Sequence, residues 1–270
     1  SSMKLAKFHG LGNEFLIASV DALPDNPDEL ARIFCDYSAG PGADGLIFNL
    51  PMEDAEIDAQ MALYNSDGTR AEISGNGLRC LAHHVYLKQD IEKNIRIRTD
   101  VGDREAQIQE AQTSESLIRV EMGSPTMGSD LSNSELIEKV GAGSIRAGYV
   151  DVGNPHIVVH FGNIGLVNIA SLGPSIEKAC SHSGINVHVV EVSDRSSILM
   201  QTWERGVGVT KACGSGAVAS AYKAQNWGLV DPQIQVVMPG GEAQVKIENH
   251  EVYLTGKSEF IGEYEVTIGV

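Results

Sequence analysis

Two short segments of the chain place a nucleophilic side chain directly before a glycine-rich turn. In ISGNGLRC, residues 73–80, Ser74 precedes the first glycine, and in ACGSGAVA, residues 212–219, Cys213 does so. The residues after each turn predict a helix, so both turns are expected to begin one. Free N–H groups and the positive end of the dipole at a helix start attract anions, which makes both segments candidate carboxylate sites.

The thiol and the hydroxyl at these two positions differ in acidity. The field of a helix start lowers the pKa of a thiol from ~8.5 towards neutrality, so the sequence predicts that Cys213 favours the thiolate, a base that can remove a proton. A hydroxyl is a far weaker acid, and Ser74 therefore cannot readily become the anionic base. Taken alone, a cysteine in such a turn is more often only a helix cap.

An internal repeat favours a catalytic role for Cys213 over a role as a helix cap only. With an offset of 139 residues, residues 61–82 align without gaps on residues 200–221, and Ser74 falls on Cys213. The same offset aligns residues 95–108 with 234–247, and with a drift of two or three residues Asn13 falls on Asn154. The repeat predicts two homologous halves, an N-terminal half over residues 3–125 and a C-terminal half over residues 126–270.

A duplicated helix start suits one particular reaction. Two such starts facing across a pseudo-two-fold axis would hold one carboxylate between two side chains, one on each face of the bound α-carbon. That geometry favours removal of a proton from one face and its return to the other, as in a racemase or epimerase. The sequence has no signal for a pyridoxal lysine, so we expect no cofactor.

The pattern of strands and helices predicts an α+β fold with mostly antiparallel sheets. Runs of β-branched and aromatic residues bounded by Gly, Pro, Asn and Asp indicate strands in both halves. Helices are expected over residues 27–38, 75–88, 174–183 and 214–227. The order of these elements is mixed rather than strictly alternating. A dinucleotide-binding interpretation of GLGNEF is weak, because the third glycine is absent and no helix is expected after it.

Composition narrows the class of protein. A chain of 270 residues with 42% hydrophobic residues is long enough for two domains, at roughly 100–200 residues each. The formal charge of −16 argues against a nucleic-acid partner. No apolar run reaches the ~18 residues of a membrane span, so we expect no membrane partner and a cytoplasmic location. The four cysteines form no CxxC pair, which argues against a metal site and favours free thiols.

Five motifs in order give the chain a family resemblance. HGLGNEF, NSDGTRAEISGNGLRC, GNPH, WERGVGVTKACGSGA and MPGGEAQV follow one another at a spacing that resembles the diaminopimelate epimerases, of the cofactor-independent two-cysteine racemase and epimerase superfamily. The resemblance extends from Met3 onward. It implies two pseudo-symmetric domains, each a mostly antiparallel sheet wrapped around a central helix, with the active site between them. It also implies interconversion of LL- and meso-diaminopimelate, on the route to lysine and peptidoglycan, by a homodimer.

The resemblance also implies roles for individual residues. Cys213 matches one of the two catalytic cysteines, and the position of the other is Ser74. His156 and Glu204 match the polar pair that assists them. Substrate-binding roles are implied for Asn13, Asn65, Gly75, Asn76, Asn154, Asn186, Glu204, Arg205, Gly214 and Ser215, of which Gly75, Asn76, Gly214 and Ser215 match donors to the carboxylate at the reacting centre. Taken singly, most of the asparagines would pass as turn residues.

Ser74 is the departure from the family pattern, and several accounts of it are open. It is a replacement of a cysteine made by mutagenesis, or a natural feature of an epimerase in which Ser74 donates a proton with help from His156 or a water. Alternatively, the chain is a one-base relative such as a 3-hydroxyproline dehydratase, or a silent amino-acid-binding scaffold. The retained GNPH and ERG motifs favour the first two accounts. Cys80 does not fill the gap, because its repeat partner is Ala219, and it is expected to pack in the core.

Overall fold

The fold is given by a computed structural model, which describes residues 1–71, 73–89, 92–112, 114–141, 143–180 and 184–269. The chain packs into two compact units. The first contains Ser1–Glu121 together with Thr255–Val270, and the second contains Met122–Leu254. Each unit is described in turn.

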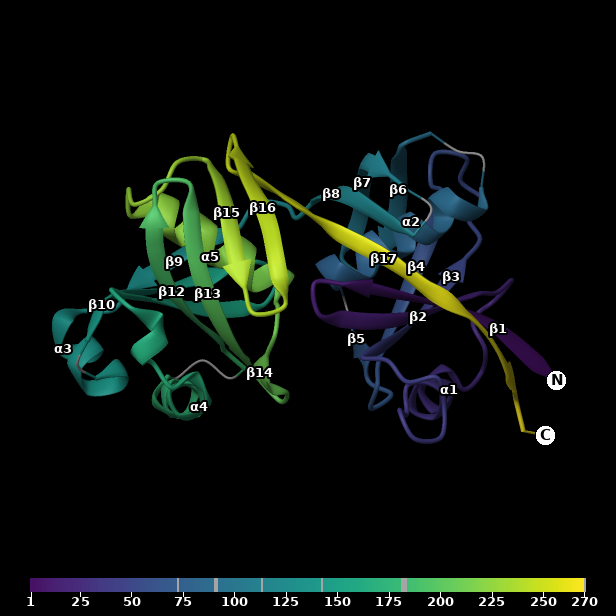
Figure 1. Ribbon diagram of the computed structural model, residues 1–270, viewed down its shortest axis with the longest axis horizontal. Coiled ribbons are helices and arrows are strands. Elements are labelled where there is room, and N and C mark those ends of the chain that lie inside the picture. Colours follow the sequence, from purple (N-terminus) through teal and green to yellow (C-terminus); the bar gives the residue numbers. More distant parts are fainter. Residues whose placement is uncertain (72, 90–91, 113, 142, 181–183, 270) are drawn as a thin grey trace. The chain divides into compact units, whose positions relative to one another are not determined.

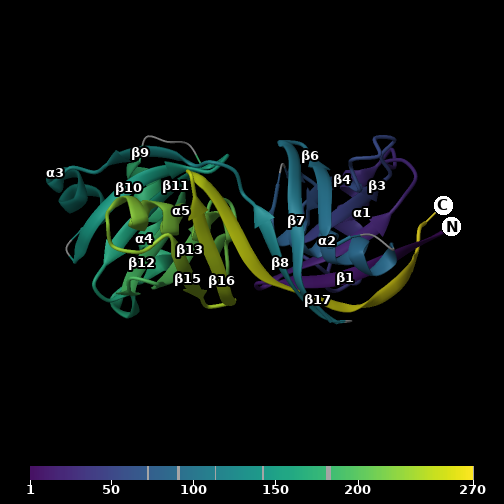
Figure 2. The same ribbon diagram turned by 90° about the horizontal axis from the view of Figure 1, so that it is seen from above.

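The strands of the first unit form a closed ring (Figures 1 and 2). Around it, β1 pairs antiparallel with β2, β2 parallel with β3, β3 antiparallel with β4, and β4 parallel with β6. The antiparallel pairs β6–β7 and β7–β8 continue it, and β17 closes it by pairing with both β8 and β1. The strands are β1 (Ser2–Gly10), β2 (Asn13–Ser19), β3 (Gly45–Leu50), β4 (Ala59–Asn65), β5 (Arg70–Ala71), β6 (Asn94–Thr99), β7 (Gly102–Ala111), β8 (Glu115–Glu121) and β17 (Glu251–Thr267).

A single buried helix fills this ring. Helix α2 (Gly75–Lys88) is buried without interruption from Gly75 to Val85, and it contacts every strand of the ring from β1 to β4 and from β6 to β8. A helix surrounded on all sides needs an apolar surface all round, and Leu78, Leu81 and Val85 supply much of it. Helix α1 (Pro27–Phe34) connects the parallel strands β2 and β3 from outside.

The second unit repeats this arrangement. The order β10–β11–β12–β13–β15–β16 has the same alternation of antiparallel and parallel pairs, and β9 pairs with β10 as β17 pairs with β1. Helix α5 (Gly214–Asn226) takes the place of α2. The other elements are β9 (Thr126–Asp130), α3 (Asn133–Glu135), a π-helical turn (Leu136–Val140), β10 (Ser144–Asp151), β11 (Pro155–Phe161), a 3-10 turn (Ile164–Leu166), α4 (Ile169–Ala179), β12 (Asn186–Asp194), β13 (Ser197–Glu204), β14 (Gly208–Thr210), β15 (Gln233–Met238) and β16 (Gly241–Glu248).

The predicted α+β class, with a sheet wrapped around a central helix in each unit, is confirmed. Helix α2 has the predicted bounds, and α5 ends one residue before its predicted end. Helix α1 is shorter than predicted, because after Phe34 the carboxylate of Asp36 accepts the N–H groups of two following residues in a turn. Helix α4 begins at Ile169, five residues before the expected start, with Pro174 inside it. The end of that predicted helix, residues 181–183, lies outside the described residues.

The packing units differ from the predicted halves at the C-terminal end. Strand β17 starts in the second unit, where the backbone of Val252 bonds to Met122 and Gly123 at 2.8 and 2.9 Å. It then continues along β1, with Ser2 opposite Thr267. Residues 255–270 therefore complete the first unit. The reason is sheet closure, since β1 needs a partner on its outer edge.

Candidate active site

Ser74 and Cys213 begin the two buried helices with nearly the same backbone geometry. Ser74 has φ −139° and ψ 123°, and its Oγ accepts the N–H of Gly77 at 3.1 Å. Cys213 has φ −145° and ψ 111°, and its Sγ accepts the N–H of Gly216 at 3.2 Å. Both are therefore N-caps, in which the side chain satisfies one of the free N–H groups of the first turn. The N–H groups of a helix's first turn suit an anion.

In the first unit, a chain of polar side chains runs along the start of α2. Asn76 Nδ2 donates to Asn13 Oδ1 at 2.6 Å, which ties the first turn of the helix to the start of β2. Arg79 in turn donates through Nη2 to Asn76 Oδ1. The structure thus brings the predicted residues Asn13, Gly75 and Asn76 together beside Ser74. Arg79 was not predicted.

The turn before Asn13 is under backbone strain. The β1–β2 hairpin has a two-residue loop, in which Leu11 has φ 49° and Gly12 has φ 85°. Two successive positive φ angles are typical of a type I′ hairpin turn, but leucine adopts this region rarely. The strained residue is also buried. The turn sets the direction in which Asn13 leaves the hairpin.

Asn65 lies at the end of β4 and is held within its own turn. Its Nδ2 donates to Thr69 Oγ1 at 3.0 Å, and the backbone N–H of Asn65 donates to the Thr69 carbonyl at 2.8 Å. The side chain is exposed. A role of Asn65 in substrate binding therefore stays a prediction.

In the second unit, Cys213 is buried and lies beside an acid. Its Sγ is 3.5 Å from Ser215 Oγ. Burial raises the pKa of the Cys213 thiol to about 12, and the Glu204 carboxylate adds to the rise through its charge and through a hydrogen bond, while Ser215 and the Gly216 N–H lower it. The expectation that the helix start favours a thiolate is wrong for this state of the protein. Desolvation and the neighbouring carboxylate outweigh the helix dipole, so Cys213 rests as a neutral thiol.

A buried chain of hydrogen bonds runs from Asn154 to Thr202. His156 Nε2 lies 2.8 Å from Asn154 Oδ1, His156 Nδ1 lies 2.6 Å from His188 Nε2, and His188 Nδ1 lies 2.8 Å from Thr202 Oγ1. Burial lowers the pKa of His156 to about 4 and that of His188 well below its ordinary value, so both rings are neutral. His188 also touches the cysteine-bearing helix, because a Cβ on Gly216 would lie 2.2 Å from its ring.

The sequence prediction missed His188 and Thr202. Both lie inside strands, where a polar residue with a sequence-distant partner gives no local signal. The available hint was a histidine within the otherwise apolar strand NVHVV, since a buried imidazole needs hydrogen-bond partners. The parallel register of β11 and β12, with His156 opposite Asn186, brings the two histidines together.

Asn186 organises the loop that carries Arg205. Its Nδ2 donates to the Pro155 carbonyl at 3.3 Å, and its Oδ1 accepts the Arg205 backbone N–H at 3.1 Å. The guanidinium of Arg205 lies over Gly184, at which a Cβ would be 2.1 Å from Nη1. The predicted residues Asn154, His156, Asn186, Glu204, Arg205, Cys213, Gly214 and Ser215 thus lie in the second unit, on β11, β12, β13, α5 and the loops that join them.

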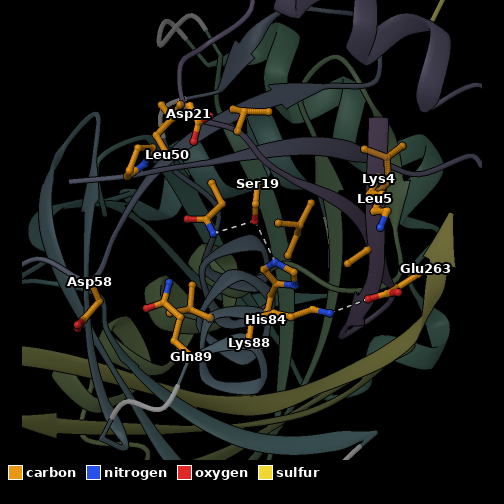
Figure 3. Close-up of a pocket in the computed structure, with 16 residues that line it drawn as sticks. Lys4, Leu5, Ser19, Asp21, Leu50, Asp58, His84, Lys88, Gln89 and Glu263 are labelled. Atoms are coloured by element: carbon orange, nitrogen blue, oxygen red, sulfur yellow. Dashed lines mark hydrogen bonds and ion pairs between the residues drawn. The ribbon is translucent and has the colours of Figure 1, made fainter. Parts of the chain in front are cut away.

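A cavity of about 560 Å³ opens in the first unit at the opposite end of α2 (Figure 3). Ser19 Oγ lies there between His84 Nε2 at 3.2 Å and Asn49 Nδ2 at 3.1 Å, and Lys88 pairs with Glu263 at 2.8 Å. None of the predicted site residues lines it. It lies at the C-terminal end of the 14-residue helix, about 20 Å along the axis from Ser74.

Within the part of the chain that the structure describes, no three His, Cys, Asp or Glu side chains gather as metal ligands would. The same residues contain no helix that is long and apolar enough to cross a membrane. The four cysteines are buried and free. The reactive groups in hand are therefore one thiol, one hydroxyl, one carboxylate and two neutral imidazoles.

Comparison with solved structures places the fold. The chain is similar to a phenazine biosynthesis protein of the PhzF family from Bacillus anthracis, with a TM-score of 0.75 and 18% identity over 99% of this chain and 100% of that one. It is also similar to a hydroxyproline epimerase from Agrobacterium vitis with bound trans-4-hydroxy-L-proline, with a TM-score of 0.72 and 17% identity over 98% and 92% of the two chains. At these identities the likeness shows the fold alone.

Sequence comparison is more specific. The chain is 36% identical to the diaminopimelate epimerase of Magnetococcus marinus over 94% of this chain and 93% of that one. It is 31% identical to that of Halothermothrix orenii over 98% of both chains. The sequence profile of the family described as diaminopimelate epimerase matches residues 5–128 and 148–261. The match covers most of the chain, and the chain therefore belongs to the diaminopimelate epimerase family.

Proposed function

We propose that this protein interconverts LL- and meso-diaminopimelate by removing the proton of one α-carbon and returning it to the opposite face, without a cofactor. The observation that carries the proposal is the matched pair of helix starts, with Ser74 Oγ and Cys213 Sγ at 3.1 and 3.2 Å from equivalent N–H groups. Family membership supports the choice of substrate. The N–H groups of such a helix start suit the α-carboxylate of the substrate.

Cys213 and Glu204 form the proton-transfer pair of the second unit. The neutral thiol donates its proton to the α-carbon, and the resulting thiolate is stabilised by the Gly216 N–H and the helix dipole. In the reverse direction, Glu204 accepts the thiol proton, and the thiolate then removes the proton of the α-carbon. The Glu204 hydrogen bond that raises the pKa of Cys213 is the path for this exchange. To return to the starting protonation, the thiolate takes up a proton from solvent after the first direction, and the protonated Glu204 releases one to solvent after the reverse direction.

Ser74 occupies the position of the second proton-transfer group. A hydroxyl can donate a proton to a carbanion, but it removes one from carbon far less readily than a thiol does. We propose that Ser74, whether introduced or natural, makes one direction of the reaction slow. His156, held neutral by burial, is proposed to assist the proton-transfer groups, as the family resemblance implies.

The polar residues around each helix start are proposed to orient the substrate. Asn13 and Asn76, together with the amides of Gly75, Gly214 and Ser215, would hold the reacting end. Asn65, Asn154, Asn186 and Arg205 would hold the distal amino-acid end, where a guanidinium can bind a carboxylate through two parallel hydrogen bonds. A homodimer and a cytoplasmic location are further predictions, of which the first is tested by sedimentation at micromolar concentration.

An isotope experiment tests the proposal. The protein is incubated with LL-diaminopimelate in heavy water, and deuterium at the α-carbon and the stereochemistry of the product are followed together. Epimerisation with deuterium uptake is the expected result. Uptake with retention of configuration would indicate a single working base, and binding with no uptake a silent scaffold; both contradict the proposal. A parallel incubation with 3-hydroxyproline tests the one-base dehydratase, which would release water from that substrate.

A further inference from the structure

Helix α2 carries a guanidinium in the core of the first unit. Arg79 is 0% exposed and is among the largest fully buried side chains. One nitrogen, Nη2, donates to Asn76 Oδ1. Within the described residues, neither Nε nor Nη1 has a hydrogen-bond partner.

Such a group is costly for the fold. Burial lowers the pKa of the Arg79 guanidinium to about 10, and the only opposing effect among described groups comes from the Cys80 thiol. No carboxylate of the described residues contributes. Removing a charge from water without a counter-charge is unfavourable, whereas an apolar side chain of similar volume fills the same space without that cost. Packing alone therefore does not explain why a charged side chain is buried here.

The space around Arg79 is shaped to hold the guanidinium in place. It lies against the backbone of Gly256 in β17, where a Cβ would be 3.0 Å from Nε and 3.1 Å from Cζ. The side chain of Leu11, in the strained hairpin turn, would lie 3.2 Å from the same Cβ. A side chain at position 256 would push directly on the guanidinium. The absence of one there leaves room for the guanidinium.

The guanidinium is directed towards the start of the helix. Long side chains on a helix point back towards its N-terminus, and Arg79 reaches Asn76, the second residue of α2. Asn76 then donates to Asn13. The positive charge therefore lies within one turn of the N–H groups beside Ser74, and its field adds to that of the helix dipole.

The repeat supplies an internal comparison. With the offset of 139 residues, Arg79 falls on Val218 of α5, which is also fully buried. Packing of the central helix therefore does not require a cation at this position. At this position only α2, whose helix start has a hydroxyl in place of a thiol, carries a cation; the buried Lys223 of α5 lies elsewhere on its helix and pairs with Asp130.

We propose that Arg79 is the buried counter-charge of an anionic ligand group bound at the N-terminus of α2, where it acts through Asn76 as a positioning residue. The inference rests on the proposed function for the identity of that group, the α-carboxylate at the reacting centre of diaminopimelate. Arg79 holds the Asn76 side chain in the orientation that binds the carboxylate. It also adds a full positive charge to the partial positive charge of the helix dipole.

The test uses Arg79→Met, which keeps most of the volume and removes the charge. We expect the ligand-free variant to be at least as stable as the original protein in urea unfolding, while its Kd for diaminopimelate, measured by calorimetry, rises at least 10-fold. The Kd of Arg79→Lys should lie between that of the original protein and that of Arg79→Met. Leu78→Met, a volume-conserving change at a fully buried neighbour, is the control and should leave Kd within two-fold.

Two measurements separate this inference from the proposed function. An analogue with a carboxamide at the reacting centre should bind both the original protein and Arg79→Met with similar Kd. Acetate, as a minimal carboxylate, should shift the Asn76 side-chain amide resonance saturably in the original protein and not in the variant. A less stable variant with unchanged Kd, or an Asn76 resonance that acetate leaves unmoved in the original protein, would overturn the inference. Failure of the isotope experiment with an intact acetate response would count against the proposed function alone.

Discussion

His156 and His188 are hydrogen-bonded imidazoles, with 2.6 Å between Nδ1 and Nε2 and with their rings stacked at 4.9 Å. The partners at each end fix the direction of the chain. Asn154 Oδ1 accepts from His156 Nε2, so His156 Nδ1 is unprotonated and accepts from His188 Nε2. His188 Nδ1 then accepts from the Thr202 hydroxyl. Each neutral ring thus carries one proton, at a nitrogen assigned from the network.

Removal of the His188 imidazole should leave the His156 ring less firmly held. In His188→Phe the ring space stays filled but His156 Nδ1 loses its donor, and a lost buried hydrogen bond corresponds to roughly 1–3 kcal/mol. We expect kcat for epimerisation to fall about 10-fold with little change in KM. The nitrogen-15 shifts of the His156 ring should change from one tautomer to a mixture. An unchanged kcat together with an unchanged His156 tautomer would contradict the positioning role.

The equivalent glycines of the two helices should respond differently to alanine. A Cβ on Gly216 would lie 2.2 Å from the His188 ring, whereas a Cβ on Gly77 would meet its nearest neighbours at 3.4 Å, an ordinary contact. Gly216→Ala should therefore lower the free energy of unfolding by roughly 1–3 kcal/mol. Gly77→Ala is the matched control and should be neutral or stabilising by up to about 1 kcal/mol. Urea unfolding of both variants measures this, and equal losses would show that His188 does not pack as described.

Glu204→Gln should increase the reactivity of the thiol while lowering turnover. The charge of Glu204 and its hydrogen bond raise the pKa of Cys213, so their removal lowers that pKa and increases the thiolate fraction. We expect faster alkylation of Cys213 by iodoacetamide at pH 8, measured by mass spectrometry of its peptide, and slower epimerisation because the proton acceptor is gone. The Cys80 peptide serves as the internal control, since burial keeps its thiol protonated. Slower alkylation of Cys213 in the variant would be inconsistent with this arrangement.

Ser74→Cys should accelerate the reaction. A thiol keeps the N-cap geometry, as Cys213 shows, and provides the missing base on the second face. General acid and base groups contribute about 10²–10⁴-fold, so we expect a gain in kcat of at least about 10²-fold. The double variant Ser74→Cys with Cys213→Ser again has one thiol and one hydroxyl, so it should lose this gain. No gain in the single variant would count heavily against the proposed mechanism.

Stability should fall between pH 6.5 and pH 4. Burial lowers the pKa of His83, His84 and His156 to about 4 in the folded protein, while the unfolded chain binds protons near pH 6.5. Below pH 6.5 the unfolded state therefore holds more protons, and stability is lost as pH falls towards the folded pKa. At pH 5 each group accounts for about 1–2 kcal/mol. Urea unfolding from pH 7 to pH 5 measures the loss, and His84→Asn should make it smaller. A flat profile would refute the prediction.

The sequence alone was sufficient to predict the two helix starts. A glycine-rich turn followed by small and apolar residues predicts a buried helix with an N-cap, and the repeat identified Ser74 and Cys213 as equivalent. What the sequence could not show depends on strand pairing. The contact of His156 with His188 follows from the parallel register of β11 and β12. The protonation of Cys213 was misjudged because desolvation depends on burial, which no local pattern reports.

The bounds of the packing units were also beyond sequence comparison. Similarity between repeats identifies equivalent segments, but it does not say which segment completes a given sheet. Here the strand beside β1 comes from the far end of the chain, as hydrogen bonding requires for closure of the ring. The burial of Arg79 could not be predicted for a related reason, because a basic residue four positions into a helix is ordinarily solvated.

Strand β17 has a consequence for the order of events during synthesis on the ribosome. The second unit is complete once Leu254 has emerged, because all of its strands and the start of β17 lie at or before that residue. The first unit, although translated earlier, keeps an open edge along β1 until Thr267 emerges. The nascent N-terminal strands therefore keep an unpaired edge exposed, although the unit translated after them is already able to fold.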